Sequence, residues 1–271
     1  MDRLSVSQMT TREWTLEEDA IRFASCGFNA IGVWRDKLTD FSIDFAASIF
    51  NDLRLQVSSL QWAGGFTGTT GMTFQEAIDD TIDAIRQASQ LDAKCLIIHP
   101  GARGFHTQSH ASRLIETALQ ELVPVAQGFE VRLALTPMPI ETGKAFTFLT
   151  SLQSVLDVCK PYRAKDVGVV FNLHHFAHQS VFDMLDQELV RRLALVQIAD
   201  HQISHGRCDR CLFGHGSIPI AWWMSQLIKL GFDGIFEAEL FGPEVQSVQY
   251  TDRLVHLKKF FAENTAGILA I

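Results

Sequence analysis

Several features that would assign the chain to a common class of protein are absent from its sequence. Positive charge is not in excess, because 31 Asp and Glu residues outnumber 23 Lys and Arg residues and no basic stripe occurs. A surface that binds the phosphate backbone of a nucleic acid is therefore not expected. No apolar run reaches the roughly 18 residues that a membrane-spanning helix needs. Neither nucleic acid nor a membrane is predicted as a partner.

Cysteine is also scarce. The five cysteines, Cys26, Cys95, Cys159, Cys208 and Cys211, are scattered and odd in number. They do not form the framework of a disulfide-stabilised secreted domain. The opening stretch MDRLSVSQMTTREW has no apolar core of the length found in signal peptides. These observations predict a cytoplasmic protein.

One unit recurs along the chain: an apolar segment, a polar loop and an amphipathic helix. Several of the apolar segments show no alternation, which is typical of parallel strands that are covered on both faces. The predicted strands lie near residues 3–8, 29–34, 55–60, 94–99, 131–137, 167–173, 193–199 and 234–240.

Helix boundaries are marked between these strands. TLEE from Thr15 and TFQE from Thr73 are capping boxes, in which the first and fourth residues satisfy each other's backbone N–H groups. The first of these helices is expected to stop near Gly27. The stretch SIPIAWWMSQLIKLG predicts another helix, starting at Ser217 and ending at Gly231, with Trp222 and Trp223 as packing residues.

Eight strands that alternate with helices predict an α/β fold, a single (β/α)8 TIM barrel forming one domain over residues 1–271. A doubly wound open sheet is the alternative, but no GxGxxG follows the first strand, as a dinucleotide-binding sheet would require. In a barrel, the C-terminal ends of the strands form the active-site face. Polar and aromatic residues occupy those ends and predict a polar ligand pocket: Trp34, Trp62, His99, Thr136, Asn172, His175, Gln197, Asp200 and Glu239.

Five motifs occur in order in the second half of the chain: LALTPMP, VGVVFNLHH, VQIADH, DRCLFGHGSIPI and GFDGIFEAELFG. With them the chain resembles the xylose-isomerase-like barrels, which include sugar and sugar-phosphate isomerases, 3-epimerases and AP endonucleases of family 2. In that family, Glu, Asp, His and Glu from successive strands hold a divalent ion. The resemblance places Thr136, Asn172, Gln197 and Glu239 at those positions.

Three of the four family ligands are thus replaced by neutral groups, which offset the dehydration of a hard ion poorly. We expect the usual site to be lost, with Glu239 left as a weak metal ligand and no cofactor required, although the family implies Mn, Mg or Zn. A relocated site at His175, Asp200, His215 and Glu239 is an alternative. Cys208 and Cys211, beside His201 and His205, form a weak signal for structural zinc.

The resemblance and the chemistry of the strand-end residues together predict roles in catalysis and binding. Glu239 would exchange a proton with the substrate, and His175 or His99 would replace the missing second base, since histidine titrates near neutral pH. Trp34 and Trp62 would form an apolar wall for a sugar. The remaining predicted substrate contacts are Thr136, Asn172, Gln197, Asp200, Arg210 and His215, with Arg210 directed at an anionic group.

The predicted function is that of a sugar or sugar-phosphate isomerase/epimerase acting on a small polyhydroxylated substrate. A lyase or dehydratase of the same superfamily, and assembly into a homo-oligomer, are compatible with the same pattern. The rival hypothesis, motivated by the replaced ligands, is a catalytically inactive barrel that binds a sugar-like ligand or a partner protein. A DNA-repair nuclease fits least, because that branch needs a metal cluster rich in His and carboxylates.

Overall fold

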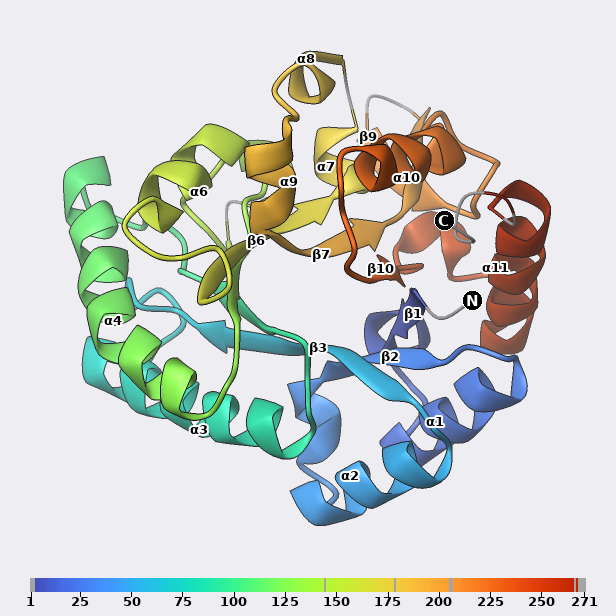
Figure 1. Cartoon of the computed structure of the whole chain (residues 1–271), viewed down its shortest axis with the longest axis horizontal. Helices are drawn as coiled ribbons and strands as arrows, with labels where there is room; N and C mark the ends of the chain where they lie inside the picture. Colours follow the sequence, from blue (N-terminus) through green and yellow to red (C-terminus); the bar gives the residue numbers. More distant parts are fainter. Residues whose placement is uncertain (1–2, 144, 178, 205–206, 266, 268–271) are drawn as a thin grey trace. The chain divides into compact units, whose positions relative to one another are not determined.

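The structure is a computed structural model that describes residues 3–143, 145–177, 179–204, 207–265 and 267. Eight strands, paired in parallel where their register is defined, close a barrel in the order β1-β10-β7-β6-β5-β4-β3-β2 (Figure 1). This confirms the predicted (β/α)8 barrel. The strands are β1 (Leu4–Ser7), β2 (Ala30–Trp34), β3 (Gln56–Gly64), β4 (Leu96–His99), β5 (Leu133–Leu135), β6 (Val167–Asn172), β7 (Leu193–Ile198) and β10 (Phe236–Ala238).

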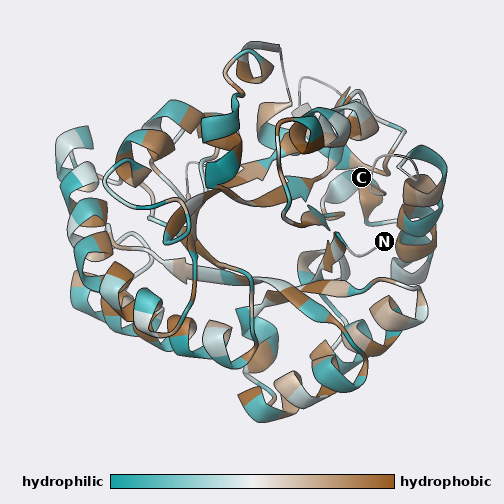
Figure 2. Cartoon of the chain, viewed as in Figure 1, coloured by the Kyte–Doolittle hydropathy of each residue, from teal (hydrophilic) through white to brown (hydrophobic). Residues whose placement is uncertain are grey.

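Helices connect the strands, and short helical turns follow several strand ends. The longer helices are α1 (Leu16–Ser25), α2 (Ile43–Asp52), α3 (Phe74–Gln90), α4 (Gln108–Gly128), α6 (Leu152–Cys159), α10 (Ile220–Lys229) and α11 (Tyr250–Asn264). The shorter ones are η1 (Gln8–Thr11), η2 (Arg35–Leu38), α5 (Ile140–Gly143), α7 (Leu173–Phe176), α8 (Gln179–Phe182), α9 (Gln187–Arg192) and η3 (Pro243–Val245). Hydrophobic residues dominate the strands, whereas the helices carry stripes of both kinds (Figure 2).

Two of the predicted helix starts are confirmed by their caps. Thr15 and Thr73 each accept a hydrogen bond from the backbone of a glutamate three residues later, whose carboxylate accepts from the cap backbone in return. The helix predicted from Ser217 begins later, at Ile220. The backbone N–H of Ser217 donates to the carbonyl of His201, and its hydroxyl is directed at the same carbonyl, so Ser217 does not cap the helix. Trp223 is buried, whereas Trp222 is 41% exposed.

The chain divides into two compact units. The first unit comprises residues 1–58, 172–191 and 196–271, and the second comprises 59–171 and 192–195. The first unit buries Leu4, Ile31 and Phe236 in its core, and the second buries Leu96 and Leu133. The prediction of one domain over the whole chain stays a prediction.

A hairpin that the sequence did not predict follows β7. Strands β8 (Asp200–Ser204) and β9 (Arg207–Cys211) pair antiparallel, with His201 opposite Arg210 and Ile203 opposite Cys208. Its sequence, DHQISHGRCDRC, is too polar for the alternation that marks a half-buried strand. His205, part of the predicted zinc signal, lies outside the described residues.

Within the described part of the chain, no helix combines the length and the apolar character that crossing a membrane requires.

Candidate functional site

A buried network of polar side chains joins the ends of three strands in the first unit. Asn172, at the end of β6, donates from Nδ2 to Gln197 Oε1 at 3.1 Å and to Glu239 Oε2 at 3.2 Å. Gln197, in β7, donates from Nε2 to Glu239 Oε1 at 3.0 Å and to Glu237 Oε1 at 3.2 Å. Three predicted site residues are therefore brought into direct contact.

Glu237 anchors the inner end of this network. Its carboxylate accepts from the Ser58 hydroxyl at 2.7 Å, and Ser58 is in turn within 2.6 Å of the Ser5 hydroxyl. A Cβ atom at Gly32 would collide with the Glu237 carboxylate. Glycine at this position of β2 is therefore what admits the charged group into the interior.

Arg210 supplies the positive charge at the outer end. Its Nη2 lies 3.4 Å from Glu239 Oε2, and its guanidinium lies 4.1 Å from the centre of the Phe241 ring. Burial, and to a smaller extent the Glu237 carboxylate, raise the pKa of Glu239 to about 7 against the opposing effect of the nearby Arg210 and Arg12 cations. A carboxyl group in this state can both accept and return a proton near neutral pH.

Arg12 is a residue of this region that the sequence analysis missed. Its guanidinium lies 4.8 Å from the centre of the Phe241 ring, so Arg12 and Arg210 contact the same aromatic side chain. Arg12 follows β1 and η1, and a search of the segment after the first strand for polar residues would have found it.

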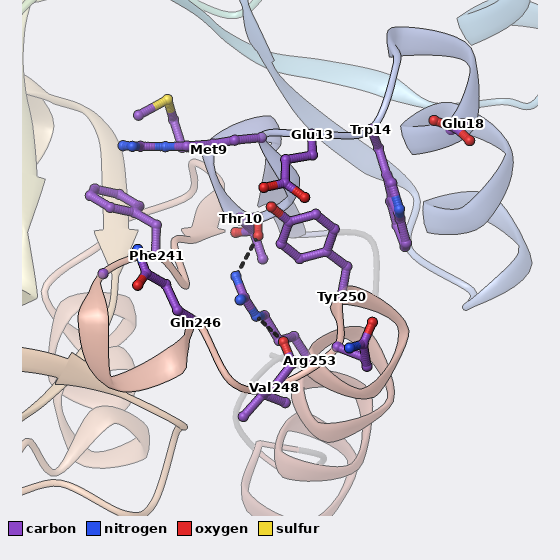
Figure 3. A pocket seen from close by; sticks show the side chains of 13 residues that line it. Met9, Thr10, Glu13, Trp14, Glu18, Phe241, Gln246, Val248, Tyr250 and Arg253 are labelled. Atoms are coloured by element: carbon purple, nitrogen blue, oxygen red, sulfur yellow. Dashed lines mark hydrogen bonds between the residues drawn. The ribbon is translucent and has the colours of Figure 1, made fainter.

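A pocket of about 730 Å³ lies beside these residues in the first unit (Figure 3). Its walls come from the segments that follow β1 and β10 and from the start of α11, and include Arg12, Trp14, Phe241 and Tyr250. Arg253 donates to backbone carbonyls of Thr10, Leu240, Val245 and Val248 and so ties these segments together. The volume is within the range of small-molecule sites.

Asp200 makes contacts of a different kind. Its carboxylate accepts hydrogen bonds from the backbone N–H groups of His201, Gly214, Gly216 and Ile218. A Cβ atom at Gly216 would collide with this carboxylate. Asp200 therefore holds the loop of residues 214–218 in place, and its predicted contact with substrate stays a prediction. His215, also predicted, is exposed in that loop.

The network does not fit the divalent ion that the resemblance implies at these positions. Asn172 Oδ1 accepts the backbone N–H of His174 at 2.9 Å, which fixes the orientation of the amide. The N–H groups of Asn172 and Gln197 consequently point at Glu239, as does the Arg210 cation. A cation bound at Glu239 would face hydrogen-bond donors and a positive charge instead of lone pairs.

A second group of side chains in the first unit could hold a metal. His174, His201 and Cys208 each offer one ligand atom. These three atoms lie within 4.8 Å of one another. Cys211, the other half of the CxxC signal, is buried opposite Asp200 and is not part of this group. Burial lowers the pKa of His174 to about 2 and also lowers that of His201. Both imidazoles are therefore neutral at physiological pH.

The second unit contains an aromatic cluster at the end of β4. The Trp62 and His99 rings lie 5.3 Å apart, and both rings lie close to Phe146. Burial lowers the pKa of His99 to about 4, so His99 does not titrate near neutral pH as an ordinary histidine would. The hydroxyl of Thr136 is buried and has no hydrogen-bond partner within the part of the chain that the structure describes.

Trp34 and His175 lie in the first unit. The backbone N–H of Trp34 donates to Gln8 Oε1 at 2.9 Å, and its side chain is partly exposed. The His175 ring is also partly exposed and lies 5.0 Å from the His174 ring. The predicted sugar wall of Trp34 and Trp62 and the predicted acid–base role of His175 stay predictions.

Comparison with known proteins assigns this barrel to a class. Residues 22–260 match the family model described as the xylose isomerase-like TIM barrel, and the chain belongs to this family. Its fold is similar to protein SMc04130 from Sinorhizobium meliloti 1021, with a TM-score of 0.87 and 22% identity over 97% of this chain and 98% of that one.

Two further solved structures have the same fold. The IolI protein with a bound zinc atom aligns with a TM-score of 0.81 and 19% identity over 99% of this chain and 100% of that one. L-ribulose 3-epimerase aligns with a TM-score of 0.79 and 14% identity over 100% and 96%. At these identities the likeness shows the fold alone.

A curated relative matches over a shorter stretch. The uncharacterized protein MJ1311 of Methanocaldococcus jannaschii is 21% identical over 161 residues, which are 58% of this chain and 54% of that protein. The match thus spans about half the length of the relative.

Proposed function

We propose that the protein is a sugar isomerase/epimerase-like enzyme acting on a small polyhydroxylated substrate. This proposal is supported by the environment of the Glu239 carboxyl group. This group is buried at the end of a barrel strand, its pKa is raised to about 7, and Arg210 lies beside it. A general base is most effective when its pKa is near the working pH.

In the proposed reaction, Glu239 removes a proton from the carbon next to a substrate carbonyl. The C–H bond breaks, its electron pair forms the C=C bond of an enediolate, and the carbonyl oxygen becomes an oxyanion. The Arg210 cation would stabilise this negative charge. The proton of the adjacent hydroxyl then moves to the former carbonyl oxygen. Glu239 returns its proton to the former carbonyl carbon, the adjacent C–O bond becomes the new carbonyl, and aldose and ketose are interconverted.

One carboxyl group can perform this interconversion alone. A two-base epimerisation needs a second acid–base group, and the strand-five position that carries Glu in the resembled enzymes is Thr136 here. His99 and His175 remain the proposed substitutes. Because burial keeps His99 neutral, a one-base isomerisation is the form of the reaction that these residues support best.

The substrate class follows from the charges near Glu239. Arg12 and Arg210 both contact Phe241, and Arg12 and Phe241 line the pocket. Two guanidinium groups suit a carboxylate or phosphate, so we propose a sugar acid or sugar phosphate. The other proposed substrate contacts are Trp34, Trp62, Thr136, Asn172, Gln197, Asp200 and His215.

Isotope exchange tests this proposal. Aldoses, ketoses, sugar acids and sugar phosphates are incubated with the protein in D2O, and deuterium at the carbon next to the carbonyl is followed by NMR. We expect exchange with at least one anionic substrate and a loss of about 10²-fold or more in Glu239→Gln. The matched control is Glu244→Gln, which changes an exposed carboxylate. No exchange in the whole panel, or exchange that Glu239→Gln leaves intact, would contradict the proposal.

A second candidate is a barrel that binds a sugar-like ligand without turnover. It is favoured by one observation: both oxygens of Glu239 already have partners in the protein. This candidate predicts that a ligand raises the melting temperature and binds in calorimetry, while no deuterium enters it.

A further inference from the structure

We propose that His174, His201 and Cys208 form a binding site for zinc or a similar transition-metal ion, separate from the family ligand positions. The three residues come from α7, β8 and β9 of the first unit. Their ligand atoms lie within 4.8 Å of one another. None of the three is among the residues at the family's metal-ligand positions, Thr136, Asn172, Gln197 and Glu239. The inference does not depend on the proposed isomerase activity.

The two imidazoles carry nitrogen atoms that lack a hydrogen-bond partner. Nδ1 of His174 and Nδ1 of His201 are buried and make no hydrogen bond within the described ranges. His174 as a whole is 7% exposed. A buried polar atom without a partner costs free energy and is rare in folded proteins. A metal ion bound through these two nitrogens would give both of them a partner.

The chemistry of the three groups selects the type of ion. Two neutral imidazoles and a thiolate suit zinc and its neighbours in the first transition row, whereas magnesium and calcium prefer oxygen ligands. Cys208 would lose its proton on binding, as thiols do at a metal. Three protein ligands also leave the fourth position of a tetrahedral ion open to water or to substrate.

The distances require only a small adjustment. Around tetrahedral zinc, neighbouring ligand atoms lie about 3.5 Å apart, somewhat closer than the limit of 4.8 Å found here. Cys208 is exposed on the hairpin, so its side chain can turn toward the two histidines without repacking the core.

The site would adjoin the network of Glu239. The backbone of His174 donates to Asn172, and Arg210, two residues after Cys208, contacts Glu239. The proposed metal site would therefore lie close to Glu239, the residue that we propose transfers the proton.

Cobalt binding tests the site without any measurement of activity. Untagged protein is stripped with a chelator and titrated with Co²⁺, and the absorption of the cobalt–thiolate charge-transfer band is recorded. We expect about one ion per chain with that band, displaced by Zn²⁺. Cys208→Ser should abolish the band, and His174→Gln and His201→Gln should each weaken binding by about tenfold or more.

Matched variants make the outcome decisive. Cys26→Ser and His110→Gln, both outside the cluster, should bind cobalt as the parent does, and so should Glu239→Gln. Circular dichroism verifies that each variant is folded. A parent without the thiolate band, or a band that survives Cys208→Ser, would overturn the proposed site. Loss of cobalt in Glu239→Gln alone would place the ion at the family position instead.

Discussion

Two groups of polar side chains in the first unit differ in their hydrogen bonding. One is the network around Glu239, and the other is the cluster of His174, His201 and Cys208. The oxygens of Glu239 accept from Asn172, Gln197 and Arg210. In the cluster, the Nδ1 atoms of the two histidines have no partner among the residues that the structure places. The comparison teaches that the Glu239 carboxylate is compensated by groups of the protein itself, whereas the unpaired histidine nitrogens mark the place where we propose an external ligand.

The largest effect is expected from removing the charge that compensates Glu239. Arg210→Met leaves a buried carboxylate without its partner, and we expect the free energy of unfolding to fall by about 3 kcal/mol at pH 8. At pH 5 the loss should be smaller, because Glu239 is then protonated. Urea denaturation at the two pH values measures both. The double variant Arg210→Met with Glu239→Gln should recover part of the loss; an equal loss at both pH values would contradict the charge pairing.

The raised pKa of Glu239 predicts a dependence of stability on pH. Between the ordinary glutamate pKa of 4.5 and the raised pKa of about 7 in the folded protein, the folded protein holds a proton that the unfolded chain has released. The free energy of unfolding therefore decreases as pH rises through this window, and we expect this group to contribute about 3 kcal/mol of the decrease. Glu239→Gln should flatten the profile and Glu244→Gln should not. An unchanged slope in Glu239→Gln would show that the carboxyl titrates normally.

A smaller effect is expected at Asp200, whose carboxylate organises a loop. Asp200→Asn replaces one acceptor oxygen by a donor, so backbone N–H groups of Gly214, Gly216 and Ile218 compete for fewer acceptors. We expect a loss of about 1.5 kcal/mol and faster hydrogen exchange at these amides. Protection that does not change in the variant would mean that the loop is held by other contacts.

The smallest effect is expected on metal affinity, when the ligands of the resembled family are restored. Asn172→Asp combined with Gln197→His, in a Cys208→Ser background, replaces donors facing Glu239 by metal ligands. We expect manganese or zinc affinity to rise about tenfold over the Cys208→Ser parent, a modest gain since Thr136 and Arg210 are unchanged. Calorimetry measures the affinity. Strong metal binding in the Cys208→Ser parent itself would contradict the account of a compensated network.

Most of the fold could be predicted, because the sequence features that mark its strands and helix starts lie within short segments of the chain. Buried parallel strands are apolar on both faces, and the capping boxes at Thr15 and Thr73 mark helix starts through contacts within one turn. The hairpin of β8 and β9 was missed because its residues are polar and lack the apolar alternation that marks a strand.

The site was predictable as a set of strand-end residues but not as a set of contacts. The sequence pointed to Asn172, Gln197 and Glu239, yet the direction of each amide depends on hydrogen bonds such as the one from His174. His174 itself was passed over for His175, the residue at the family's motif position. Its approach to Cys208 joins residues far apart in the sequence, which no spacing reveals.

The metal content of untagged protein, determined by elemental analysis after zinc loading and dialysis, tests the contrast between the two clusters most directly. The parent, Cys208→Ser and Glu239→Gln are analysed in parallel. The account predicts about one zinc per chain in the parent and in Glu239→Gln, and much less in Cys208→Ser. Zinc retained in Cys208→Ser but lost in Glu239→Gln would contradict it, and would make the altered family site the one that binds metal.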